Sequence, residues 1–163
     1  MVEKLVDKRV EGIRRLLKPL DHVGGYGIRP GMYLVQGALA LPGGVSFTIH
    51  SLGAYSCELA LFHRGQKEPY TVIPFPEEYR IGDTYSMIVF GLDIEENEYA
   101  FRFDGPYDPG KGLLFDKERY LLDPYARAVV GQSKWGEKTE NYLTYRARVV
   151  EERFSWGKST CPD

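Results

Sequence analysis

An aromatic side chain flanked by two carboxylates stands out in the stretch "DGPYDPG", residues 104–110. A surface tyrosine ring can pack on the C–H face of a sugar while polar groups nearby take its hydroxyls. Tyr107, Asp104 and Asp108 are therefore candidate carbohydrate-binding residues, and Trp135, in a polar stretch further along the chain, is another. The alternative for each aromatic residue is that it anchors a loop or covers a sheet edge. The same choice applies to four further tyrosines: Tyr26, Tyr33, Tyr70 and Tyr79.

The composition of the stretch predicts that it holds Tyr107 rigidly. Two prolines fix φ and restrict the unfolded chain. Gly105 and Gly110 are expected to adopt backbone angles that other residues avoid, and Asp108 is expected to bond to nearby backbone amides. A rigidly presented aromatic ring loses less entropy on binding, whether the target is a sugar or another protein surface.

Other kinds of site have little support in the sequence. The three histidines, His22, His50 and His63, show no metal-ligand spacing, and Cys57 falls at an inward strand position, where cysteine is normally inert. Motifs for a nucleophilic serine, a dinucleotide or a phosphate are missing. With 23 acidic residues, the proximity of two carboxylates carries no information. The sequence therefore predicts no metal, no cofactor and no catalysis by this chain.

The elements that position the candidate residues are strands. Apolar residues alternate with more polar ones over 45–50, 57–62 and 98–104, which predicts strands with one face inward and one outward. "PYTVIPF" and "TYSMIVFGL" predict two more, and "YRARVVEERF" contains a last one. The short turns between them leave no room for crossover helices. We therefore expect an all-β, antiparallel β-sandwich.

The ends of the chain differ from its middle. Apolar residues recur every three or four positions from Val2 to Leu17 and predict a short N-terminal helix over 2–17, while 21–31 have turn composition. We expect an N-terminal helix and linker over 1–29, the sandwich over 30–130, and a loop, last strand and tail over 131–163.

Composition narrows the class of protein further. The chain has 163 residues, and 21 basic against 23 acidic residues give a net charge of −2, which argues against nucleic acid as a partner. The sequence lacks a signal-peptide pattern and an apolar run long enough to span a membrane. Cys57 and Cys161 are expected to be free thiols. We therefore expect a cytoplasmic protein that does not contact a membrane.

Several segments together resemble the N-terminal region of isoamylase-type glycogen debranching enzymes and pullulanases of the α-amylase superfamily. They are "GGVSFTIHS", "CELALFHRG", "YAFRFDGPYDPGKGLLFDKERYLLDPYARAVVG" and "VVEERFSWG". The resemblance implies an immunoglobulin-like sandwich of the carbohydrate-binding module family 48 type. In that family the module precedes a (β/α)₈ barrel, which carries the catalytic carboxylates and hydrolyses α-1,6-glucosidic branch points. The resemblance also implies that this chain ends about where the barrel would begin.

The resemblance suggests three roles. In glycogen-binding relatives a sugar platform combines a Trp in the loop after an early strand, a Lys on a later strand and an aromatic after the Asp-Gly turn. Tyr107 matches the third feature, but Ala100 stands in place of the Lys and the loop "HRGQKEPY" has no Trp. This favours a non-catalytic module that packs on the barrel and shapes its groove. The candidates for contact with carbohydrate or with the barrel are then Tyr107, Trp135, Asp104 and Asp108, with the barrel slightly favoured as the target of Tyr107. The alternatives are an autonomous α-glucan-binding domain and a protein-interaction sandwich.

In the favoured role the partner is glycogen, starch or maltooligosaccharide, reached directly or through the barrel. A face that packs on a barrel is also expected to expose an apolar patch.

Overall fold

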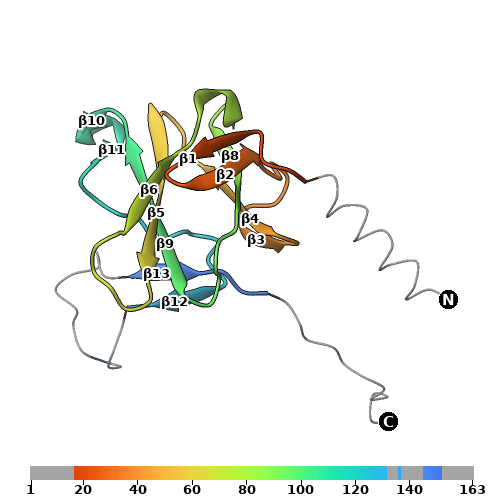
Figure 1. The fold of residues 1–163 in the computed structure, drawn as a ribbon. Coiled ribbons are helices and arrows are strands. Elements are labelled where there is room, and N and C mark those ends of the chain that lie inside the picture. Colours follow the sequence, from red (N-terminus) through yellow and green to blue (C-terminus); the bar gives the residue numbers. More distant parts are fainter. Residues whose placement is uncertain (1–16, 132–135, 137–144, 152–163) are drawn as a thin grey trace, which may run out of the picture.

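Two antiparallel sheets face each other in the computed structural model, which describes residues 17–131, 136 and 145–151 (Figure 1). The first sheet has the order β1-β2-β8-β4-β3, with β7 also paired to β8. Its strands are β1 (Asp21–Val23), β2 (Tyr26–Pro30), β3 (Gly37–Leu41), β4 (Gly44–His50), β7 (Arg80–Ile81) and β8 (Thr84–Phe90).

The second sheet has the order β12-β13-β9-β5-β6. Its strands are β5 (Ser56–His63), β6 (Thr71–Pro74), β9 (Asn97–Asp104), β12 (Ala128–Val130) and β13 (Arg146–Arg148). A separate two-stranded sheet, β10 (Tyr107–Asp108) with β11 (Leu113–Leu114), lies at the end of the molecule away from β12 and β13 (Figure 1). The predicted all-β antiparallel sandwich is confirmed.

The core forms where the inward side chains of the two sheets meet. Phe47 of β4 and Tyr99 of β9 are buried and make an edge contact, with ring centroids 5.0 Å apart. Tyr85 of β8 approaches Phe103 of β9 in the same way, at 6.5 Å. The inward side of the predicted alternation is therefore confirmed.

Much of the outward side of the alternation is buried as well, which the prediction did not include. Ser46, Thr48 and Ser86 point outward from the first sheet but are buried, and Ser46 and Thr48 hydrogen-bond to the backbone of Met32. On the second sheet Ala60, Phe62 and Ala100 form a small buried cluster of their own. Period-two patterning cannot show that another segment of the chain folds over a sheet.

Residues 21–31 were expected to be turns, but they form the hairpin β1–β2. Gly24 and Gly25 both have positive φ, 59° and 85°, as the two central residues of a type I′ hairpin turn require. The following strand enters the core, where Ile28 is buried and pairs with Val89 of β8. The sandwich therefore begins before residue 30, and the paired glycines mark a turn inside it.

The structure describes little of the two chain ends. The helix predicted over 2–17 falls outside the described residues except for its last position, as do Trp135 and Cys161. The regular helical elements among the described residues are two 3₁₀ turns, Glu77–Tyr79 and Pro109–Lys111, and none of these residues forms a membrane-spanning helix. The predicted last strand is confirmed as β13, which pairs with β9 through Ala147 and Tyr99.

Candidate functional site

The stretch around Tyr107 is a hairpin rather than one crowded turn. Tyr107 pairs with Leu114 and Asp108 with Leu113, and the chain reverses through the 3₁₀ turn that follows. Gly112 has the left-handed conformation there, with φ of 73°. Gly105 and Gly110 are not among the positive-φ glycines, so the prediction that they adopt unusual backbone angles is wrong.

Gly105 is needed for a different reason, which is close packing. A β-carbon at this position would lie 2.6 Å from two ring atoms of Phe115. Asp104 accepts a hydrogen bond from the Gly105 backbone N–H at 2.9 Å. Asp108 was predicted to bond to nearby backbone amides, but its side chain does not cap the 3₁₀ turn that follows it. Its carboxylate lies 3.3 Å from Lys111 Nζ instead.

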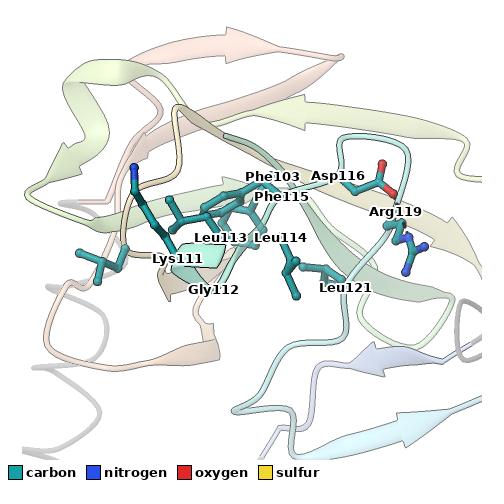
Figure 2. A pocket seen from close by; sticks show the side chains of 10 residues that line it. Phe103, Lys111, Gly112, Leu113, Leu114, Phe115, Asp116, Arg119 and Leu121 are labelled. Carbon is teal, nitrogen blue, oxygen red and sulfur yellow. Dashed lines mark hydrogen bonds and ion pairs between the residues drawn. The ribbon is translucent and has the colours of Figure 1, made fainter. Parts of the chain in front are cut away.

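Two hollows flank this hairpin. The first has a volume of about 420 Å³ and is lined mainly by apolar side chains from three parts of the chain, including Leu52, Phe103, Leu113 and Phe115. Figure 2 shows the phenylalanine and leucine side chains gathered together, with Asp116 and Arg119 to one side. The second hollow, about 520 Å³, is lined by Asp104, Tyr107, Lys117 and Glu118 among others.

The second hollow combines an aromatic ring with charged groups of both signs. Tyr107 is 71% exposed, and Arg119 donates to Asp116 at 2.8 Å, with both residues lining the same hollow. A smaller hollow nearby contains Glu58 and Arg102. Arg102 donates to Glu58 at 2.6 Å, which raises the pKa of Arg102. This arrangement can offer a ring face and hydrogen bonds to a hydroxyl-rich ligand. We call residues 104–119 together with Leu52 the hairpin surface.

The outer face of the second sheet offers no such platform around Ala100, because side chains cover this part of the face. Ala100, the position matched to the platform lysine, is 0% exposed. The rings of Tyr120 and Phe62 meet edge to face at 5.4 Å, and the Arg146 guanidinium lies 4.0 Å from the centroid of the Phe62 ring. Sequence patterning does not reveal this cover, since Tyr120 and Arg146 are far from β5 in sequence.

A second aromatic feature was also missed. His63, at the end of β5, stacks on Tyr70 with ring centroids 4.1 Å apart and an interplanar angle of 12°. The Tyr70 hydroxyl bonds to that of Tyr26 at 2.8 Å, and burial together with this bond raises the pKa of Tyr70. His63 and Tyr70 meet because β5 and β6 pair as a hairpin. In the sequence, only the lengths of the two predicted strands hint at this contact.

The remaining candidate groups are structural in the described part of the chain. Tyr79 is buried and donates to Asp21 at 3.0 Å, and burial raises its pKa to about 12. The Cys57 thiol is buried and free, and burial raises its pKa. His50 is exposed and bonds to Thr84. Among the described residues, His, Cys, Asp and Glu form no group able to hold a metal ion.

Asp123 is the most buried carboxylate among the described residues, and no local sequence pattern marks it. It is 1% exposed and accepts hydrogen bonds from the Tyr99 hydroxyl at 2.7 Å and from the Tyr125 backbone N–H at 2.8 Å. Burial raises its pKa, and the two hydrogen bonds oppose this. Asp123 thus ties the segment after Leu121 to the centre of β9.

Comparison with known proteins identifies the family. The sequence profile of carbohydrate-binding module 48 (isoamylase N-terminal domain) matches residues 35–126. The chain belongs to this family. This carbohydrate-binding module 48 is 34% identical over 117 residues to maize (Zea mays) isoamylase SU1, and the match covers 69% of this chain and 15% of that protein. It is 36% identical over 146 residues to the glycogen debranching enzyme of Serratia proteamaculans, covering 83% of this chain and 21% of that enzyme.

Solved structures share the fold of this carbohydrate-binding module 48. The pullulanase type I of Bacillus subtilis, solved with maltose, superposes with a TM-score of 0.51 at 18% identity over 78% of this chain and 14% of that one. The pullulanase of Paenibacillus barengoltzii, solved with maltohexaose and α-cyclodextrin, gives 0.51 at 15% identity over 72% of this chain and 15% of that one. The chain therefore spans about a fifth or less of the length of these relatives.

Proposed function

We propose that this chain is the non-catalytic N-terminal module of a glycogen- or starch-debranching glycoside hydrolase that acts on α-1,6-glucosidic branch points. In this role the module packs on the catalytic barrel and helps to shape its substrate groove, while the chain itself catalyses nothing. The protein works in the cytoplasm, and its sandwich is of the immunoglobulin-like type. The family membership and the short share of each relative's length support this role.

The observation that carries the proposal is the cover over Ala100 on the second sheet. Ala100 clusters with Phe62 of the same sheet under Tyr120, and Arg146 lies over the Phe62 ring, at the position where glycogen-binding relatives place part of a sugar platform. A glucan chain cannot stack at this position without displacing packed side chains. The closed position therefore favours a packing role over independent capture of glycogen.

Autonomous α-glucan binding is the second candidate, and the hairpin surface favours it. Tyr107 is largely exposed beside a hollow that contains Asp104, Lys117 and Glu118. Asp108 lies in the same hairpin, and its carboxylate forms an ion pair with Lys111. Any direct contact of this chain with glycogen, starch or maltooligosaccharide is expected to run through this hollow.

Affinity electrophoresis in native gels with and without glycogen tests the choice. We expect the chain to migrate equally in both gels, and Tyr107→Ala to migrate like the parent chain. Retardation by glycogen that disappears in Tyr107→Ala supports the autonomous role instead. A reducing-end assay on branched α-glucan should show no release by the purified chain, and release would contradict the non-catalytic role. Binding to an unrelated protein, with no effect on any debranching enzyme, would favour a protein-interaction sandwich.

A further inference from the structure

A second exposed apolar region lies where the loop before β3 adjoins the segment after Leu121. A β-carbon on Gly37 would lie 2.9 Å from Tyr125 Cβ, so the two segments are in contact there. Five large apolar side chains of these segments are exposed: Met32, Leu34, Val35, Leu122 and Tyr125. We call these five residues the pinned patch.

Buried hydroxyls hold the first segment in place. The Met32 backbone N–H donates to Ser46 Oγ at 2.9 Å, and the Met32 carbonyl accepts from Thr48 Oγ1 at 3.3 Å. Thr48 is bonded in turn to Ser86 at 2.6 Å. The loop closes through a hydrogen bond from the Val35 N–H to the Met32 carbonyl at 2.9 Å. The backbone at the base of the loop is therefore fixed, although Leu34 near its tip is 99% exposed.

A buried carboxylate and a backbone pair hold the second segment. Leu121 exchanges two backbone hydrogen bonds with Phe101 of β9, at 2.7 and 2.9 Å. Asp123 is bonded to the Tyr99 hydroxyl and to the backbone of Tyr125. Leu122 and Tyr125 are consequently presented from a fixed backbone. Side chains on a preorganised surface lose less entropy when they are covered.

The patch has the composition of a protein interface and not of a sugar site. Residues 30–38 contain no charged residue, and the only one in 121–126 is the buried Asp123. Interface centres are depleted of charges and enriched in aromatic residues and methionine. Sugar sites need polar groups around the aromatic ring to take the hydroxyls. The chemistry that fits the patch is therefore an apolar protein surface.

We propose that the pinned patch docks the part of the polypeptide that the debranching relatives carry outside the matched segment. This inference rests on the proposed function and names the surface through which it works. A stable complex between separate chains usually buries roughly 1,200–2,000 Å², which is more than a patch of five side chains offers. A contact within one polypeptide needs far less area, because linkage makes the effective concentration high. The docked segment is therefore the same polypeptide and not a second copy.

Oxidative footprinting of a fusion tests this directly. The 163-residue chain is fused to the part of the S. proteamaculans enzyme that lies outside its matched segment, and the fusion is compared with the isolated chain. We expect the oxidation rates of Met32 and Tyr125 to fall severalfold in the fusion while that of Tyr107 is unchanged. Unchanged reactivity of Met32 and Tyr125 overturns the proposal. So does protection of Met32 in the isolated chain that grows with protein concentration, because a second copy would then be the occupant.

A charge placed on the patch gives an independent readout. Leu34→Asp should restore the reactivity of Met32 and Tyr125 in the fusion, whereas Leu20→Asp, at another exposed leucine, should not. Continued protection in Leu34→Asp contradicts docking at the patch.

Failure of docking at the pinned patch and failure of the packing role would give different footprinting results. Protection that moves to Tyr107 and Leu114 in an active fusion keeps the packing role and rejects the patch. Protection at neither surface, with debranching activity that does not depend on the module, rejects the packing role itself.

Discussion

The hairpin surface and the pinned patch both expose large apolar side chains, but they differ in charge and in support. Residues 104–119 include seven charged residues, and the surface is hollowed on both sides of a two-stranded sheet. The pinned patch exposes no charge from its own segments and is supported by buried hydroxyls and a buried carboxylate. The first surface resembles a site for a polar ligand and the second a protein contact, although both were built from loops of one sandwich.

The largest expected effect comes from removing the carboxylate that supports the patch. Asp123→Ala leaves the buried Tyr99 hydroxyl and the Tyr125 N–H without their acceptor, which should lower the free energy of unfolding by about 3 kcal/mol. Urea unfolding followed by circular dichroism measures this. Asp123→Asn keeps one of the two acceptor oxygens and should lose about half as much. Equal losses in the two variants would contradict the idea that a retained acceptor oxygen preserves part of the stability.

Overpacking the base of the hairpin should have a moderate effect. Gly105→Ala places a methyl group against the Phe115 ring, 2.6 Å from its atoms, and should cost about 1–2 kcal/mol. Gly110→Ala is the matched control, because its nearest neighbour is an Asp108 carboxylate oxygen at 3.3 Å. Thermal unfolding of both variants separates the two positions. A Gly110→Ala variant as unstable as Gly105→Ala would mean that packing against Phe115 is not what requires Gly105.

The support of the patch should also depend on pH. Burial raises the pKa of Asp123 above its ordinary value of 3.8, so the folded protein holds a proton more tightly than the unfolded chain. The stability from this group is fully present below the unfolded pKa and is lost as pH rises through the folded pKa. Urea unfolding of the parent chain and Asp123→Asn across the acidic range checks the sign. A parent chain that gains stability relative to Asp123→Asn as pH rises would contradict it.

The smallest effect is expected at the most exposed aromatic of the hairpin surface. Tyr107→Ala removes a side chain that is 71% exposed and should change the free energy of unfolding by less than about 0.5 kcal/mol. Thermal unfolding beside the parent chain measures it. A larger loss would mean that Tyr107 anchors the hairpin and that its place at the hollow is incidental.

The candidate site could be predicted from the sequence only in part. The position and exposure of Tyr107 followed from local composition, and so did the inward phase of β4, β5 and β9. The roles of Gly105 and Asp108 did not, because they depend on Phe115 and Lys111 once the hairpin has closed. Trp135 lies outside the described residues and stays a prediction, as do the carbohydrate-binding or barrel-contact roles of Tyr107, Asp104 and Asp108.

By itself the sequence determined the all-β class, most of the strands and the family, because alternation along a strand and turn composition are local properties. Only the tertiary structure decided that Tyr120 and Arg146 cover the outer face of the second sheet around Phe62. Only the tertiary structure also brought Tyr125 beside Gly37 to make an uncharged patch. Both features join residues distant in sequence, and their burial depends on how the sheets pack and on where the segment after β11 crosses them.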